Sequence, residues 1–345
     1  MKFACDPTVR SLDRRALLIG AGLSGLASPA LAQGRRRFRV GINAVPQAPR
    51  RQLEGILRDF DQRLSALTSG RLGLEPVDGV VDLTSVATGD VDAILGPQDV
   101  WIDQDPLFGL FTACPCGLTP SEFAAWIGQG GGQGLWDALG AAHGVRAQLV
   151  GDIGPHTLGW FKEPLQDTAA FSAVRYGTAG LGIEAVRAIG AQPVLPGTVA
   201  DATESAEPTQ GIQPGGVLHS TAVFRPQSAV ALTWNLGVAT EWTEQDRGIL
   251  RAIGYAVTDL VMAQTLRDQA SQMAAVPADA VAPVPADLSM DVMQRGWSAI
   301  AEQVLTASSV PQGWEAYRYF LEDIAAWSQI GDGAFSLARA KALEV

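Results

Sequence analysis

Apolar residues recur along the chain at two spacings, one typical of strands and one typical of helices. Residues 38–42, 71–77 and 91–95 are short apolar or alternating runs, which predict strands. Between the first two runs, residues 52–67 carry apolar side chains at helical spacing, and Ser69-Gly70 marks the end of that helix. Strand, helix, strand is how an α/β domain with a parallel sheet begins, so α/β is the fold class we expect.

The rest of the chain repeats these patterns in a different order. Further strands are predicted at residues 145–151, 157–161, 217–224 and 229–236, and helices at residues 119–142 (interrupted near Gly131), 182–189, 243–273, 289–306 and 313–327. The chain therefore crosses between two groups of strands more than once, as two-lobed binding proteins with a hinge do. We expect lobe I at residues 36–154 and 226–260, lobe II at residues 155–225 and 261–310, and C-terminal helices at residues 311–345 that pack across both lobes.

The first 32 residues have the pattern of an export signal. Arg14-Arg15 precede an apolar run over residues 16–31, and Ala30-Leu31-Ala32 supplies the small residues that precede a cleavage site. This pattern predicts a signal peptide of the twin-arginine type, cleaved after Ala32, and hence a periplasmic protein. Residues 20–25 also fit the G-x-G-x-x-G dinucleotide fingerprint. Charged arginines precede them where the fingerprint needs a strand, and residues 41–50 lack the acid that it also needs, so we expect no cofactor.

Composition narrows the class of protein further. The chain has 345 residues, of which 47% are hydrophobic and 18% charged, as is typical of a folded protein long enough for two lobes. Its net charge of −11 argues against binding to nucleic acid or to an anionic membrane surface. The three histidines lie in no nucleophile elbow, metal-binding motif or evident triad, so we expect no enzyme.

One stretch of the chain combines residue types in an informative order. An aromatic-basic strand at residues 159–163 leads to an arginine and a glycine-rich turn at residues 175–182. A short helix, a second strand that ends near Val194 and an acidic cluster at residues 201–204 follow. A positive side chain and an acid, both at strand ends, suit a cleft that holds a small carboxylate.

This stretch resembles the solute-binding proteins of tripartite ATP-independent periplasmic (TRAP) transporters, nearest the subgroup that binds keto acids and related small carboxylates. Segments at residues 130–136, 242–246 and 314–320 resemble further motifs of that family, in the family's order. The resemblance implies a two-lobed periplasmic binding protein with a small carboxylate ligand and the TRAP membrane permease subunits as partners. Members of the subgroup can dimerise through C-terminal helices, so a monomer and a homodimer both stay open. A divergent binding protein that serves as a sensor or partner-binding module, without transport, is the alternative.

The resemblance also implies which residues hold the ligand. The family has an arginine on the strand before the glycine turn that binds the ligand carboxylate, and Arg175 has that position; the alternative is a surface arginine at a strand end. Glu204 matches an acid that the family places beside the ligand, or else it is a solvated or arginine-paired acid. Arg225 stands where the subgroup has a glutamate that helps to ligate a cation. A guanidinium has no acceptor, so we expect no metal. Either Arg225 replaces the cation's charge, or it pairs with Glu204 or Asp201 and neutralises them.

Ser205, His156 and Trp160 complete the predicted ligand site. Ser205 stands where the subgroup has tryptophan, which suits a ligand that is larger or more polar than a short keto acid. His156 donates a hydrogen bond to the ligand or changes its charge with pH, or else it is a satisfied loop histidine. Trp160 either flanks the pocket or lies in the core. Residues 197–200 are too few for a parallel crossover, which needs about a dozen residues, so we expect the second lobe to be trimmed there.

Overall fold

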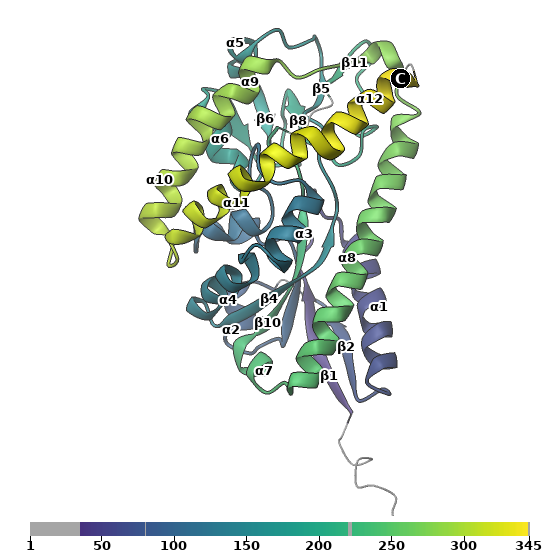
Figure 1. Cartoon of the computed structure of the whole chain (residues 1–345), viewed down its shortest axis with the longest axis vertical. Coiled ribbons are helices and arrows are strands. Elements are labelled where there is room, and N and C mark those ends of the chain that lie inside the picture. Colours follow the sequence, from purple (N-terminus) through teal and green to yellow (C-terminus); the bar gives the residue numbers. More distant parts are fainter. Residues whose placement is uncertain (1–34, 80, 220–222, 344–345) are drawn as a thin grey trace, which may run out of the picture.

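The computed structural model describes residues 35–79, 81–219 and 223–343. The predicted signal peptide, residues 1–32, lies outside the described residues. The described chain forms two lobes, one around a five-stranded sheet and the other around two three-stranded sheets, with long helices along their sides (Figure 1). The predicted fold class, α/β with two lobes, is confirmed.

Lobe I is built on a mixed five-stranded sheet in the order β2-β1-β3-β10-β4. Its strands are β1 (Arg36–Ile42), β2 (Leu72–Val77), β3 (Ala93–Gly96), β4 (Val145–Asp152) and β10 (Ala229–Asn235). β1 runs parallel to β2 and β3, as the strand-helix-strand pattern predicts, whereas β10 runs antiparallel to β3 and β4. Because β10 joins the sheet after the chain has passed through lobe II, more than one segment connects the lobes.

Helices cover both faces of this sheet. On one side lie α1 (Arg50–Leu67) and α8 (Glu244–Met273), and on the other α2 (Leu83–Ala87), α3 (Pro120–Gly128) and α4 (Gly132–Ala142). Successive strand residues point to opposite faces. Leu95 therefore packs among buried residues of α1 and α8, and Ile94 among those of α2, α3 and α4. Each such leucine or isoleucine stabilises the fold by about 2 kcal/mol on full burial, so the alternation holds the sheet between two helical layers.

Lobe II contains two small sheets. Its strands are β5 (Gly159–Phe161), β6 (Arg175–Gly177), β7 (Gln192–Val194), β8 (Ala202–Thr203), β9 (Val217–His219) and β11 (Val281–Ala282), and its helices are α5 (Thr168–Ser172), α6 (Gly182–Ala188), α9 (Ala286–Asp291) and α10 (Trp297–Ala307). β9 lies between β5 and β11, and β6 lies between β7 and β8. Tyr176 of β6 is fully buried and packs against Phe171 and Phe224, which ties this sheet to the core of the lobe.

The connection between β7 and β8 corrects one expectation from the sequence. Residues 195–201 do join two parallel strands, on opposite sides of β6, and they do so without a helix. A short connection suffices because β7 has three residues and β8 has two. The chain returns over only about 10 Å, which a short extended segment can span.

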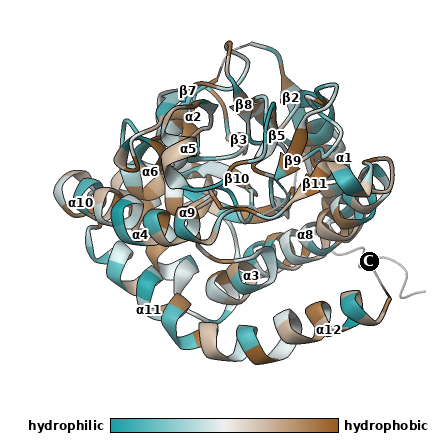
Figure 2. Ribbon diagram, turned by 90° about the horizontal axis from the view of Figure 1, so that it is seen from above, coloured by the Kyte–Doolittle hydropathy of each residue, from teal (hydrophilic) through white to brown (hydrophobic). Residues whose placement is uncertain are grey.

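Long helices link and flank the lobes. α8 begins at the capping box of Thr243 and Asp246 and runs without a break through the predicted lobe boundary at residue 260. The short α7 (Leu236–Thr240) precedes it. α11 (Gln312–Ser328) packs through buried Trp314 and Tyr317, whereas α12 (Ala334–Ala342) has no buried residue and lies at the edge of the molecule (Figure 2). None of the described helices is long and apolar enough to cross a membrane.

Candidate functional site

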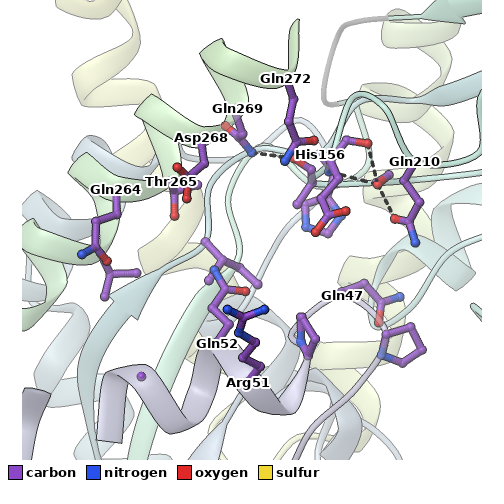
Figure 3. Close-up of a pocket in the computed structure, with 18 of the residues that line it drawn as sticks. Gln47, Arg51, Gln52, His156, Gln210, Gln264, Thr265, Asp268, Gln269 and Gln272 are labelled. Carbon is purple, nitrogen blue, oxygen red and sulfur yellow. Dashed lines mark hydrogen bonds between the residues drawn. The ribbon is translucent and has the colours of Figure 1, made fainter. Parts of the chain in front are cut away.

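A cleft of about 790 Å³ lies between the two lobes (Figure 3). Its walls come from the start of α1, from the C-terminal half of α8 and from three segments of lobe II, at His156, at residues 196–197 and at residues 203–210. Most of the lining side chains are polar, and six are glutamines: Gln47, Gln52, Gln210, Gln264, Gln269 and Gln272. Of the residues that the sequence predicted for the ligand site, His156, Glu204 and Ser205 line this cleft, and Arg175, Arg225 and Trp160 do not.

The lobe II wall is held in place by its own backbone. Thr157 and Ser205 form a bridge, with N–H···O distances of 2.8 and 3.3 Å, and the N–H of His156 donates to the carbonyl of Arg225 at 2.9 Å. The Ser205 hydroxyl donates to Oε1 of Gln210 at 2.6 Å. These bonds fix His156, Ser205 and Gln210 next to one another on the wall that faces α1.

Arg225 and two acids form a buried cluster behind this wall. Nε of Arg225 donates to Glu204 at 3.0 Å, and Nη2 donates to Asp99 at 2.8 Å. Further donors face the Ser228 hydroxyl and the Ala179 carbonyl, each at 3.4 Å. Asp99 follows β3 in lobe I and Glu204 follows β8 in lobe II, so Arg225 bridges the lobes. The sequence left open whether Arg225 replaces the charge of a cation or pairs with acids, and these contacts are those of an arginine paired with acids. Glu204 is one partner, and Asp99 takes the place of Asp201 as the other.

Burial controls the protonation of the groups around this cluster. It raises the pKa of Glu204, and the charge of Arg225 offsets this only in part. It also raises the pKa of Asp152 to about 6, against the effect of two backbone N–H donors. Burial, together with the charge of Arg225, lowers the pKa of His156 well below its ordinary value, so its imidazole is neutral near pH 7.

Several buried polar atoms near the cleft have no hydrogen-bond partner in the described part of the chain. They are Oε2 of Glu204, Oδ2 of Asp152, both ring nitrogens of His156 and both amide atoms of Gln227. Buried polar groups are ordinarily hydrogen-bonded to protein or to ordered water. His156 and Glu204 also line the cleft, so its lobe II wall holds an unpaired neutral imidazole and an unpaired carboxylate oxygen.

Arg175 lies outside the cleft. It is exposed at the start of β6, where its guanidinium donates to the carbonyl of Val199 and its backbone N–H donates to Asp201 at 2.8 Å. This is the placement of a surface arginine at a strand end, and it anchors the crossover from β7 to β8. At the opposite end of β6, the carbonyl of Gly177 accepts from the N–H of Glu204 at 3.1 Å.

Trp160, which the sequence offered for the site, and Trp101, which follows β3, are both buried. Trp160 is 4% exposed, packs with Leu218 and Val276, and donates from Nε1 to the Pro208 carbonyl at 2.8 Å. Trp101 packs edge-on against Phe108 in the main core. The structure places Trp160 in the core, the second of its two alternatives.

Sequence reasoning missed most of the charged residues of this region, among them Asp99, Asp152 and Arg51. Asp99 lies just after β3 and Asp152 ends β4, and strand ends of this kind are where α/β proteins gather their binding groups. Arg51 lines the cleft from the first turn of α1. The signal for it was present, because Arg50-Arg51 directly precede the helix predicted at residues 52–67.

No protein-family model matches the chain. A monocarboxylate 2-oxoacid-binding periplasmic protein of Nostoc sp. is 27% identical over 143 residues, which is 39% of this chain and 39% of that protein. A solved TRAP transporter solute-binding protein of Bordetella bronchiseptica matches 90% of this chain and 99% of its own, with a TM-score of 0.77 and 17% identity. The chain has the fold of a TRAP solute-binding protein.

Two further TRAP proteins share this fold. Those of Colwellia psychrerythraea, with bound calcium and pyruvate, and Pseudoalteromonas atlantica, with bound sodium and pyruvate, have TM-scores of 0.75 and 0.74. Each is 17% identical and covers 87% of this chain and 98% of its own. The Bordetella protein is a dimer with calcium and picolinate in one of its sites.

The residues of the present chain do not fit a metal at the Arg225 cluster. Asp99 and Glu204 face each other there, and the Arg225 guanidinium lies between them and bonds to both. A guanidinium offers no lone pair to a metal, and its charge repels one. Across residues 35–79, 81–219 and 223–343, no three His, Cys, Asp or Glu side chains gather so as to hold a metal ion.

Proposed function

We propose that this protein is a periplasmic solute-binding protein that captures a small carboxylate between its lobes and delivers it to the membrane subunits of a TRAP transporter. One observation carries the proposal: the TRAP fold extends over about nine tenths of the chain and encloses a polar cleft between the lobes. The names of the similar proteins give pyruvate, picolinate and 2-oxoacids as their ligands, all of them carboxylates. The role requires closure and reopening of the lobes and no turnover.

The predicted signal peptide, residues 1–32, supports a periplasmic location, as does the periplasmic relative from Nostoc. A homodimer is the assembly we propose. α12 has no buried residue, and its Phe335 and Leu337 are 63% and 74% exposed. A helix of so few residues is marginal in water unless something covers its apolar face, and a second copy of the chain would do so.

A second function is a sensor or partner-binding module without transport. The observation that favours it is that neither Arg175 nor Arg225 lines the cleft, although both were expected to hold the carboxylate. A receptor of this kind would bind its ligand and then a signalling protein, and would have no permease partner.

A thermal-shift screen of the mature chain, from Gln33 onward, tests the proposed function. Carboxylates of two to seven carbons are added with calcium and, separately, after chelation. A ligand that binds only the folded state raises the melting temperature. We expect at least one acid to do so and the shift to survive chelation. A shift that needs metal would contradict the metal-free cluster, and no shift with any acid would favour the second function.

A further inference from the structure

The N-terminus of α1 opens into the cleft with an unusual charge pattern. Pro49 is the N-cap residue, no side chain caps the helix, and the first turn holds Arg50 and Arg51 with no acid. The free N–H groups of a helix N-terminus carry a partial positive charge, which ordinarily favours acids and disfavours arginines. α1 therefore concentrates positive charge at a helix end that forms part of the cleft wall.

The two arginines differ in their surroundings. Arg50 pairs with Glu54 at 2.8 Å and with Asp78 at 3.5 Å, and it does not line the cleft. Arg51 lines the cleft, and among the described residues no carboxylate oxygen lies within 4.0 Å of its guanidinium nitrogens. Arg58 lines the cleft about two turns further along α1, away from the free N–H groups.

A second, independent observation on the opposite wall points to a ligand. His156 is 1% exposed, lines the cleft, and has two ring nitrogens without a partner in the described chain. Glu207 lines the same wall beside Glu204, whose charge is paired with Arg225, and the carboxylate of Glu207 would repel a ligand carboxylate toward Arg51. Asp59 lines the cleft from α1 beside Arg58, and Asp268 lines it from α8, so the anion-attracting part of the cleft is confined to the first turn of α1, around Arg51.

The glutamines between these walls suit hydroxyl groups. Figure 3 shows Gln47 and Gln52 on the side of Arg51, Gln210, Gln269 and Gln272 around His156, and Gln264 further along α8. Three of the six side chains form hydrogen bonds within the described chain: Oε1 of Gln210 and Oε1 of Gln272 each accept one, and Nε2 of Gln269 donates two. Each of the six therefore keeps at least one amide nitrogen or oxygen that is free to bind a ligand. A carboxamide can donate and accept, as a hydroxyl can. A cleft of about 790 Å³ also falls in the range of pockets for ligands much larger than a three-carbon acid.

We propose that the cleft binds a polyhydroxylated monocarboxylate, with its carboxylate at Arg51 and the N-terminus of α1 and its hydroxyls on the glutamines and His156. This inference rests on the proposed function and names the ligand class and the residue that anchors it. A guanidinium matches a carboxylate in shape and charge, and the free N–H groups of the helix add donors beside it. Arg225 then has a structural role, and Arg51 supplies the charge that selects acids.

Calorimetric titration of the mature protein tests this with three probes of known structure: D-gluconate, pyruvate and the neutral polyol sorbitol. We expect gluconate to bind more tightly than pyruvate, and sorbitol to bind weakly if at all. Arg51→Gln should weaken gluconate binding about tenfold or more, since hydrogen bonds to charged groups are among the stronger ones. Arg50→Gln removes the same charge from the same turn outside the cleft, so it should change the dissociation constant less than about threefold.

Two results would overturn the inference and leave the proposed function standing. One is tighter binding of pyruvate, or of any acid without hydroxyls, than of gluconate. The other is gluconate binding that Arg51→Gln leaves unchanged, or that Arg58→Gln weakens in its place. If no acid binds at all, the proposed function fails, and the inference fails with it.

Discussion

Arg225 holds together two carboxylates that are themselves almost fully buried, Asp99 and Glu204. Replacing it by alanine leaves both negative charges in the interior without a partner. We therefore expect Arg225→Ala to lower the free energy of unfolding by about 3–5 kcal/mol, measured by urea denaturation. Arg187→Ala, which removes an exposed pair with Glu184, is the control and should cost less than about 1 kcal/mol. Equal, small losses in the two variants would contradict a structural role for Arg225.

Asp152 predicts a dependence of stability on pH. Burial raises the pKa of its carboxyl to about 6 in the folded protein, whereas an unfolded aspartate titrates near about 3.9. Between these values the unfolded state has lost its proton and the folded state still holds it. The contribution of Asp152 to stability therefore falls as the pH rises from about 4 to about 6, and stays level above that.

Asp152→Asn isolates this effect because asparagine does not titrate and keeps the oxygen that accepts from the N–H groups of Gly154 and Ser228. We expect the free energy of unfolding of the variant, minus that of the wild type, to increase between pH 4 and about pH 6. Urea unfolding across that range measures it. A difference that is constant with pH would show that the Asp152 pKa is not raised.

At the residue scale, the sequence predicted the lobe II wall better than the charges behind it. The resemblance identified Glu204, Ser205 and His156 from the local order of residues, and all three line the cleft. The sequence named Glu204 as a possible partner of Arg225, but the second partner, Asp99, could not be found in this way, since it is 126 positions away along the chain. The distance along the sequence says nothing of which acid a buried arginine will meet.

Secondary structure elements were predictable where a pattern repeats within one segment. Residues 52–67 appear as α1, and the break predicted near Gly131 separates α3 from α4, with Gly131 at a φ of 86° that favours glycine. The connection from β7 to β8 was not predictable from its length alone. Its feasibility depends on how short the two strands are, and strands of two or three residues carry too little pattern to be delimited.

Arg175 anchors that connection, and this gives a prediction for the element. We expect Arg175→Ala to speed hydrogen exchange in residues 195–201, because the guanidinium no longer bonds to the Val199 carbonyl. Global stability should change by less than about 1 kcal/mol, since the side chain is exposed. Arg187→Ala on neighbouring α6 should leave the exchange of this segment unchanged. Loss of carboxylate binding in Arg175→Ala, with unchanged exchange, would restore the ligand-binding role that the resemblance implied.

At the scale of the whole molecule, two kinds of contact join the lobes. α8 packs on the lobe I sheet and reaches lobe II, where Gln269 donates to the carbonyls of Pro155 and Ala206, each at 3.0 Å. Arg225 adds the bridge from Asp99 to Glu204. α8 and the Arg225 bridge thus connect the two lobes that form the cleft walls, and a hinged closure of the lobes around a ligand requires such a connection.

The C-terminal helices carry the prediction for assembly. Exposed apolar side chains run from the end of α11 through α12, with Trp327 at 69%, Phe335 at 63% and Leu337 at 74% exposure. Exposed apolar patches of this kind mark contact surfaces. We expect sedimentation at micromolar concentrations to show a dimer for the wild type and a monomer for Leu337→Asp, since a charge at the interface would be buried without a partner.

Leu67→Asp is the matched control for this test, because Leu67 is 59% exposed at the end of α1, far from α12 in the sequence. It should leave the dimer intact. If the wild type sediments as a monomer at every concentration, the proposal that a second copy of the chain covers α12 is wrong. A dimer that persists in Leu337→Asp would place the interface on another face. In either case the cleft and its Arg51 wall would keep their proposed role, since no residue of α12 lines the cleft.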